Sequence, residues 1–315
     1  ETCSLSSDAV VSPLMVCVSF SSFSPSSGAL RIDVTFALAD ADGELIRLRC
    51  DRETNCKATG FFRCEQDAQG RWRFVTPGGH GFYAMGCNGP SGMFGELCPA
   101  LGYAPYTRVL QKKYGQDHAR WAETTVGRLS DWGFNVVNSW PRFDESLRGR
   151  GVATTSVIQL GHRFARSLPD GSRNLYEGTG YAGIFPDVFN PEFGKFCEDL
   201  AEKECGAFRN DPWTFGWFLD NELGWRGACN LVNGCSDDAR GGLFMYDLVL
   251  LKDGGCPARK AQARFLERRG LKAGEPVPDE VKRDFMRMGA NRYFRIASGA
   301  VRKAAPNRLY LGCRF

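Results

Sequence analysis

A Glu preceded by an Asn follows an apolar, aromatic-rich run of strand length in the middle of the chain. The run spans residues 214–219, and Asn221 and Glu222 follow it after Asp220, with Trp225 close behind. Because aromatic surroundings disfavour a carboxylate anion, a carboxyl group in this setting is expected to hold a proton near neutrality. Such an acid can protonate the leaving oxygen of a glycosidic bond, and the adjacent Asn can hydrogen-bond a sugar hydroxyl.

A less specific interpretation is that Glu222 is only the first polar residue to reach water after a buried strand, or a cap for the next helix. The flanking sequence favours the catalytic interpretation. It resembles the fourth barrel strand of retaining glycoside hydrolases of the Asn-Glu type, most closely the agarase and β-galactosidase-like members. This resemblance implies that Glu222 is the general acid/base and that Asn221 binds the sugar next to the scissile bond.

Three other segments support the agarase-like resemblance, which extends from about residue 60 to residue 315. They resemble the entry into the first barrel strand, the start of the helix before the fourth strand, and the fifth strand, and they span residues 70–88, 185–193 and 307–315. The implied architecture is a (β/α)8 TIM barrel of the α/β class, of which about five of eight strands are present.

The hydrophobic pattern agrees with this architecture, because strand-like and helix-like segments alternate from residue 81 onward. We expect strands at 82–86, 134–140, 155–162, 214–222 and 309–313. Helices are expected at 118–132, with Ala122, Val126 and Leu129 on one face, from Pro191 onward, with Asn190 as the cap, and at 281–301. Residues 1–75 are expected to form a β-rich, sandwich-like module with hairpins at 30–50 and 61–75. Residues 76–315 are expected to form the N-terminal part of the barrel domain.

Polar and aromatic residues at the ends of the predicted strands are candidates for substrate binding, because chemistry in such barrels collects at the C-terminal ends of the strands. The Trp side chains can stack on sugar faces and the His can bond a hydroxyl, although core packing is an equally simple role for each. The candidates are Asn88, Asn138, Trp140, His162 and Trp225, with Arg314 as a weaker one.

A retaining mechanism also needs a nucleophilic carboxylate about 5–5.5 Å from the acid/base. The resemblance places this nucleophile at the end of the seventh strand, which the five predicted strands do not reach. It gives Asp220 no nucleophilic role, although Asp220 lies only two residues from Glu222. We therefore expect an additional chain segment to complete the barrel.

The predicted function is cleavage of β-galactosidic linkages in an extracellular polysaccharide by a retaining mechanism. The alternative is a catalytically silent carbohydrate-binding protein, or an inactive fragment that lacks the nucleophile. No cofactor or metal is expected, since the 13 Cys residues include no CxxC pair and only three His are present. The residues 229–235 can instead close a small disulfide loop, and Cys197 and Cys205 suit the buried stripe of a helix.

The charge pattern argues against other classes of partner. A net charge of +4 is small for 315 residues, and the basic residues of the last third have the spacing of solvated helix faces, so nucleic-acid binding is not expected. An anionic polysaccharide remains compatible with this surface. No apolar run reaches the roughly 18 residues of a membrane span, and residues 14–20 suit a strand.

Overall fold

The computed structural model describes residues 16–18, 56–67, 69–90, 97–139, 147, 149–176, 184–224, 245–272 and 275–314. The chain forms two compact units, of which unit 1 comprises Glu1–Thr155 with Pro212–Phe215, and unit 2 comprises Ser156–Asp211 with Gly216–Phe315. Strands β7 (Ala153–Val157) and β8 (Thr214–Phe218) each run from one unit into the other. The predicted division near residue 75 is a different one and stays a prediction.

Unit 1 contains β1, β5, β6 and the first part of β7, which are neighbours in the sheet in that order. Strand β1 (Val16–Val18) pairs in parallel with β5 (Met85–Asn88), which pairs in parallel with β6 (Val136–Ser139). A strand near residue 16 was expected, but its place beside β5 was not. This pairing joins segments about 70 residues apart, so no local pattern encodes it.

A three-stranded antiparallel sheet in unit 1 comprises β2 (Arg63–Gln66), β3 (Trp72–Val75) and β4 (Gly81–Phe82). The hairpin between β2 and β3 is confirmed, with Asp67 and Gly70 in its turn. Phe215 packs against Phe62, which directly precedes β2, and against Phe74 and Phe82 of this sheet, with ring centroids 5.0–5.6 Å apart. The second predicted hairpin, at residues 30–50, lies outside the described residues.

Two helices precede β6, namely α1 (Pro105–Tyr114) and α2 (His118–Asp131). Asp117 caps α2 by accepting a 2.9 Å hydrogen bond from the Arg120 amide. The predicted apolar stripe of Ala122, Val126 and Leu129 is buried, so this helix is confirmed almost to the residue.

Unit 2 combines β8 and β9 (Leu309–Tyr310), which pair in parallel, with the helices that lie between the strands along the chain. Its strand order is β7–β8–β9. The helices are α3 (Leu160–Ala165), α4 (Phe193–Cys205), the short 3₁₀ helix η3 (Gly206–Phe208), α5 (Met245–Leu250), α6 (Pro257–Glu267) and α7 (Asp279–Ala304).

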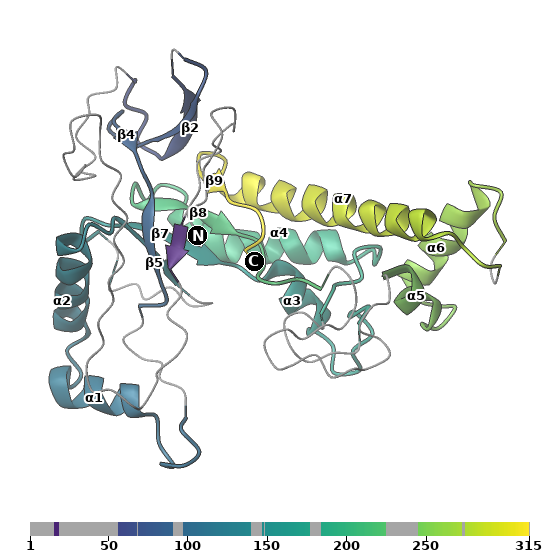
Figure 1. Cartoon of the computed structure of the whole chain (residues 1–315), viewed down its shortest axis with the longest axis horizontal. Helices are drawn as coiled ribbons and strands as arrows, with labels where there is room; N and C mark the ends of the chain where they lie inside the picture. The colour runs from purple at the N-terminus through teal and green to yellow at the C-terminus, as the bar shows by residue number, and fades with distance from the viewer. Residues whose placement is uncertain are drawn as a thin grey trace, which may run out of the picture. The chain divides into compact units, whose positions relative to one another are not determined.

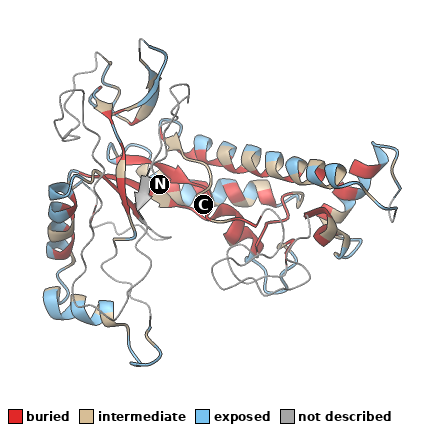
Figure 2. Ribbon diagram, in the orientation of Figure 1, coloured by how far each residue is buried: buried red, intermediate tan, exposed pale blue. Residues whose placement is uncertain are grey.

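The core of unit 2 lies between α4 and α7, which run side by side (Figure 1). Their buried residues recur every four positions, which places them on one stripe of each helix. The opposite face of α7 is exposed (Figure 2). The stripes are Phe193, Cys197, Ala201 and Cys205 on α4, and Phe285, Gly289, Tyr293, Ala297 and Val301 on α7.

The predicted start of α4 was two residues too early. Asn190 does accept a bond from a backbone amide, but the donor is Glu192, and the helix begins only at Phe193. Local polar residues therefore identified the turn correctly while tertiary packing set the first helical residue. None of the helices in the described part of the chain has the length and apolar character needed to cross a membrane.

Gly216 allows β8 and β9 to approach each other closely. A Cβ atom at this position would lie 2.4 Å from the Leu309 carbonyl oxygen. Because the obstacle is backbone, the strands would have to separate to admit any side chain.

We expect Gly216→Ala to lower the free energy of unfolding by about 1–3 kcal/mol, as overpacking does. Gly299→Ala is the matched control, since Gly299 lies on the exposed face of α7, where an added Cβ atom would have no neighbour within 4 Å, and Ala favours the helix. Urea titrations of both variants test the expectation, and an equal stability of the two would contradict it.

The buried thiols of α4 predict a loss of stability at alkaline pH. Burial raises the pKa of Cys197 and of Cys205 far above the usual value. Unfolding exposes these thiols, which then ionise near pH ~8.5, whereas the folded protein retains their protons. The free energy of unfolding should therefore be unaffected below about pH 8.5 and fall above it, by up to ~1.4 kcal/mol per pH unit for each thiol.

Urea titrations between about pH 8 and 10 measure this dependence. Cys197→Ala should give a shallower decline than the parent chain, because one titrating group is removed. Val301→Ala controls for the loss of core packing, since Val301 is buried and carries no ionisable group. A decline as steep in Cys197→Ala as in Val301→Ala would rule out this origin of the pH dependence.

Candidate active site

The predicted Asn-Glu pair lies just beyond the C-terminal end of β8. The main chain after Phe218 is bonded to the segment that follows β9, since the Leu219 amide donates to the Gly312 carbonyl at 2.7 Å. Asn221 then forms a parallel bridge with Arg314, and the Glu222 amide donates to the Arg314 carbonyl at 2.9 Å. The positions of both residues are thus set by main-chain hydrogen bonds.

Asn221 and Glu222 differ in their exposure. Asn221 is buried, and its side-chain oxygen accepts a 2.5 Å bond from the Arg314 guanidinium. Glu222 is half-buried and has a φ of +49°, in the left-handed region that non-glycine residues rarely adopt. Such backbone strain costs on the order of 1–3 kcal/mol and is concentrated at functional sites. Because Glu222 has left the strand conformation, strand alternation does not relate its side chain to that of Asp220.

Asp220 is the most heavily hydrogen-bonded side chain at this end of the strand. It is completely buried, and its carboxylate accepts four bonds from three residues. The donors are the Gly161 amide at 2.6 Å, the His162 amide at 3.0 Å, the His162 Nδ1 at 2.8 Å and the Tyr293 hydroxyl at 2.6 Å. Burial of a carboxylate is costly unless its oxygens are satisfied in this way.

Tyr293 contributes its hydroxyl from the core face of α7. Burial raises the pKa of Tyr293 well above its usual value, and the Asp220 charge raises it further, so the hydroxyl remains a donor. The same hydroxyl lies 3.5 Å from the Cys313 sulfur, and burial raises the pKa of Cys313 to about 12. The network therefore joins β8, α7 and the segment after β9 without requiring an ionised thiol or phenol.

Gly161 lets the first turn of α3 reach this carboxylate. A Cβ atom at Gly161 would lie 3.0 Å from Asp220 Oδ2 and 3.2 Å from the Tyr293 ring. The absent side chain leaves room for two amides at the helix start to point at the carboxylate, as the unsatisfied N–H groups of a helix N-terminus favour.

His162 was expected at the end of a strand, and this placement was wrong. Strand β7 ends at Val157, the chain turns at Gln159 with a φ of +63°, and His162 lies in the first turn of α3. Only 1% of its surface is exposed, and its ring bonds Asp220. Its hydrogen bond to a sugar hydroxyl stays a prediction, which this burial does not favour.

In unit 1, the structure brings Asn88 and Asn138 together at the ends of β5 and β6. They are register partners, and the Asn138 side-chain amide donates to the Asn88 side-chain oxygen at 2.7 Å. The Thr155 hydroxyl, from β7, donates to the Asn138 oxygen at 2.8 Å. Three neighbouring strands therefore contribute to one polar cluster, although Asn138 is only 2% exposed.

The remaining predicted residues lie outside the described ranges, namely Trp140, Trp225 and the cysteines of the 229–235 loop. Cys197 and Cys205 are buried free thiols, as expected from their stripe. Within the described ranges, no group of three His, Cys, Asp or Glu side chains is arranged to hold a metal ion.

The sequence did not identify the residues that hold Asp220 in place. Their separations along the chain, 58–73 residues, carry no short-range signal. One signal was present, because Tyr293 lies on the apolar stripe of α7 and a buried hydroxyl there requires a polar partner in the core.

We expect Tyr293→Phe to lower the free energy of unfolding by about 1–3 kcal/mol, because a buried carboxylate loses a donor. Tyr310→Phe is the control, since Tyr310 is half-buried and its hydroxyl makes no hydrogen bond among the described residues. Equilibrium unfolding in urea measures both changes. Equal effects of the two substitutions would show that the Tyr293–Asp220 bond contributes no net stability.

Sequence comparison relates the chain to β-agarases, although no protein-family model matches it. It is 25% identical to β-agarase B of Vibrio sp. (strain JT0107) over 345 aligned positions, which cover 82% of this chain and 34% of the agarase. It is 24% identical to β-agarase A of the same strain, over 81% of this chain and 31% of that protein. The chain thus spans about a third of the length of these relatives.

Solved structures give the same relation at the level of the fold. The chain matches BpGH50 with a TM-score of 0.62 and 23% identity, over 84% of this chain and 54% of that one. It matches an exo-β-agarase with a TM-score of 0.59 and 22% identity, over 82% and 47% of the two chains. The agarase AgWH50C gives 0.57 and 24%, over 82% and 42%. The chain is therefore similar in sequence to β-agarases over most of its length, which confirms the agarase-like resemblance.

Proposed function

We propose that this chain is part of a glycoside hydrolase that cleaves β-galactosidic linkages in an agarose-type polysaccharide. The observation that carries this proposal is the position of Asn221 and Glu222 beyond the C-terminal end of β8, in a chain that is similar to β-agarases. A polymeric galactan substrate also favours an extracellular or secreted protein.

The proposed architecture is a (β/α)8 barrel to which this chain contributes the N-terminal strands. Support comes from the parallel pairing of β1 with β5, β5 with β6, and β8 with β9. Asn88 and Asn138 lie at the carboxyl ends of β5 and β6, and Asn221 and Glu222 lie just beyond that of β8. Barrel enzymes carry their chemistry at these ends of the strands. An additional chain segment would supply the remaining strands.

Glu222 is the proposed general acid/base of a retaining reaction. As an acid it protonates the leaving glycosidic oxygen, and as a carboxylate it later removes a proton from the water that attacks the glycosyl-enzyme. The half-exposure of Glu222 and its fixed amide are consistent with both steps. Asn221 is proposed to bond the sugar beside the scissile linkage, which would require it to exchange its bond to Arg314.

The nucleophile is proposed to come from outside this chain. A retaining enzyme needs a second carboxylate about 5–5.5 Å from the first. Asp220 is poorly suited to this role, because it is completely buried and its oxygens are already bonded by Gly161, His162 and Tyr293. A nucleophile requires an accessible lone pair.

Further substrate contacts are proposed for Asn88, Asn138, Trp140, His162 and Trp225. The two Asn side chains are preorganised by their mutual hydrogen bond and by Thr155. A ligand hydroxyl would compete with these bonds, so Asn88, which is half-buried, is better placed to bind a sugar than Asn138.

The decisive experiment is Glu222→Gln in the full-length protein. We expect the kcat for agarose oligosaccharides to fall by about 10²–10⁴-fold, the usual contribution of a general acid/base, while oligosaccharide binding persists. An aryl β-galactoside with a good leaving group needs no protonation, so its first step should be slowed far less. Azide should restore turnover of that aryl substrate, because it attacks the glycosyl-enzyme without a general base.

Glu267→Gln is the matched control, because Glu267 is an exposed residue at the end of α6 and should leave kcat unchanged. Full activity of Glu222→Gln on agarose oligosaccharides would refute the assignment. Proton NMR of the first product supplies a second criterion, since inversion of the anomeric configuration would exclude the retaining mechanism.

A second candidate function is sugar binding without hydrolysis. It is favoured by the engagement of Asp220, the carboxylate nearest to Glu222 in the sequence, in four structural hydrogen bonds. In that case the full-length protein would bind agarose oligosaccharides calorimetrically and release no reducing ends.

A further inference from the structure

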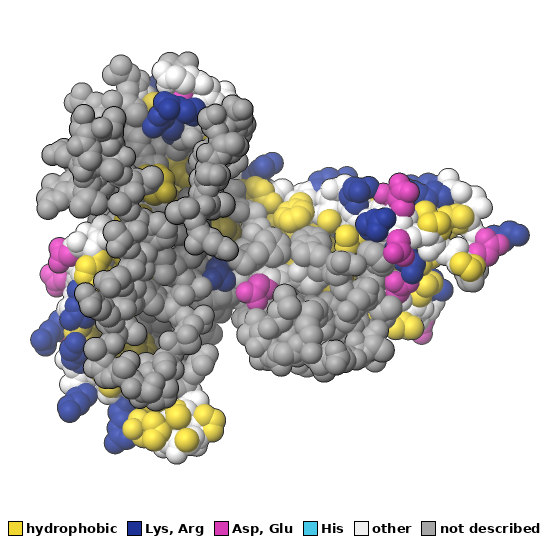
Figure 3. All heavy atoms as spheres, viewed as in Figure 1, with side chains coloured by type: hydrophobic (Ala, Val, Ile, Leu, Met, Phe, Trp, Pro, Cys, Tyr) yellow, Lys and Arg dark blue, Asp and Glu magenta, His cyan; other side chains and the backbone are white. Residues whose placement is uncertain are grey.

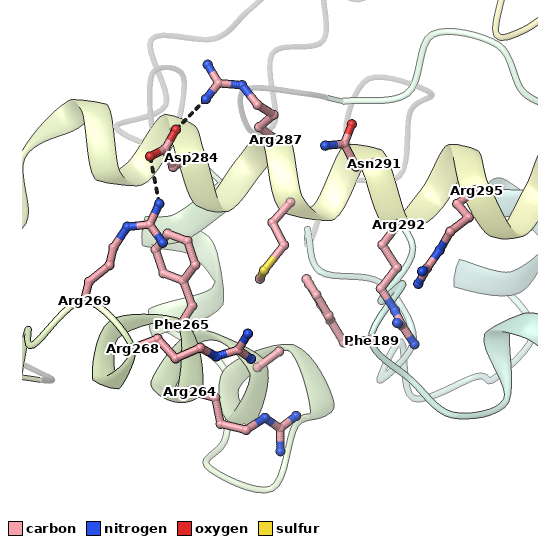
Figure 4. A pocket seen from close by; sticks show the side chains of 12 residues that line it. Phe189, Arg264, Phe265, Arg268, Arg269, Asp284, Arg287, Asn291, Arg292 and Arg295 are labelled. Carbon is pink, nitrogen blue, oxygen red and sulfur yellow. Dashed lines mark hydrogen bonds and ion pairs between the residues drawn. The ribbon is translucent and has the colours of Figure 1, made fainter.

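A pocket of about 730 Å³ in unit 2 is lined by α6, α7 and Phe189 (Figure 4). Its volume is within the range of small-molecule sites in proteins. Arginines dominate its lining, with six against one acidic residue, Asp284. They are Arg264, Arg268, Arg269, Arg287, Arg292 and Arg295.

Three of the arginines have structural roles. Asp284 accepts bonds from Arg269, at 2.9 Å, and from Arg287, so it offsets much of the charge at one end of the pocket. Arg292 donates to the Val188 carbonyl at 2.6 Å. These bonds fix the walls of the pocket.

The other three arginines form the binding set that we consider. Arg264, Arg268 and Arg295 are exposed, and none of their guanidinium groups makes a hydrogen bond or ion pair with the described residues. Figure 4 shows Arg264 projecting from α6, Arg268 from the position directly after α6, and Arg295 from α7. Guanidinium groups bind planar or tetrahedral oxyanions in bidentate geometry, and the local excess of positive charge attracts them.

The apolar residues that line the pocket are Phe189, Ala261, Phe265 and Met288. Phe189 stacks on Phe285 with ring centroids 5.8 Å apart, and the Arg269 guanidinium covers Phe265 at 4.1 Å. Phe265 is only 5% exposed. The half-buried Phe189 ring has Phe285 stacked on it and the Arg292 guanidinium 5.9 Å from its centroid. Neither ring therefore offers an open face on which a nucleobase could stack. The pocket therefore favours a ligand that presents oxyanions over one that presents aromatic bases.

The pocket lies on a different side of α7 from the Asp220 network. Arg292 and Arg295 lie on the face of α7 that lines the pocket, whereas Gly289, Tyr293 and Ala297 lie on its buried face. Neither Asn221 nor Glu222 lines the pocket, so the binding of a ligand there is separable from the chemistry.

We propose that this pocket binds sulfate esters on a galactan chain, and so holds a charged region of the polymer whose neutral linkages are cleaved elsewhere. The choice of polymer rests on the proposed function, whereas the preference for an oxyanion rests on the arginines alone. The volume exceeds the needs of a single inorganic ion, and the three exposed arginines come from α6, the residue after it, and α7. They can therefore bind more than one sulfate of the same chain.

The test compares two triple variants of the full-length protein that change the charge equally. Arg264→Ala, Arg268→Ala and Arg295→Ala together remove the proposed binding set. Lys260→Ala, Lys272→Ala and Arg283→Ala remove three exposed cations from the same part of the chain, outside the pocket. The probes are a sulfated galactan oligosaccharide, a neutral agarose oligosaccharide of the same length, and duplex DNA.

We expect the pocket variant to lose roughly tenfold of its affinity for the sulfated oligosaccharide at low salt, as three exposed ion pairs permit. The control variant should lose less than about twofold, and the neutral oligosaccharide should bind all forms equally. An equal loss in both variants would overturn the proposal, because the affinity would then depend on the net charge of the protein and not on the pocket. Tighter binding of DNA than of the sulfated oligosaccharide would also overturn it.

Glu222→Gln separates this proposal from the proposed function. It should leave the affinity for the sulfated oligosaccharide unchanged, because Glu222 does not line the pocket. Persistent hydrolysis in Glu222→Gln would therefore count against the catalytic assignment alone, while loss of selective binding in the parent protein would count against the pocket alone. Unchanged thermal unfolding of both triple variants confirms that the comparison reports binding.

Discussion

The buried carboxylate of Asp220 is the interaction on which the rest of unit 2 depends. A carboxylate with no exposed surface is unfavourable unless each oxygen is bonded, and here the donors come from α3 and α7. Each donor can reach Asp220 only if its own element is correctly placed. Burial of this charge is therefore favourable only when three separate parts of the chain are correctly placed.

This constraint also determines where the candidate acid/base lies. The Arg314 amide donates to the Asp220 carbonyl, and the Arg314 carbonyl in turn accepts the Glu222 amide. Asp220 therefore fixes α3 and α7 through its side chain, and the segment after β9 through its main chain. Glu222, with its left-handed backbone, is the first side chain beyond this bonded region that is partly open to solvent. The bonded segment directly before Glu222 limits the motion of this residue through main-chain hydrogen bonds, which do not involve the Glu222 carboxyl group.

The features that the sequence predicted correctly are those set by neighbours within a few residues. The α2 stripe follows from helical spacing, and the β2–β3 hairpin from a turn between alternating strands. His162 was misplaced because the strand pattern continues past Val157, while the chain turns at Gln159 to bring an amide and a ring to Asp220. That turn is determined by a partner 58 residues away, which no local pattern contains.

The basic residues of the last third of the chain are a second example of a property that local sequence patterns do not contain. Helical spacing correctly places them on exposed faces, and Figure 3 shows Lys and Arg side chains on the surface of these helices with Asp and Glu among them. When each helix is considered alone, such faces are only solvated. Packing α6 against α7 brings arginines from both into one pocket with a single carboxylate, so the local charge is far from the near-neutral average of the sequence. One helix, α7, thereby supplies Tyr293 to a buried anion on its inner face and a set of cations on its outer face. Because the buried stripe fixes the rotation of α7 about its axis, the interaction that holds Asp220 also determines which arginines point into the pocket.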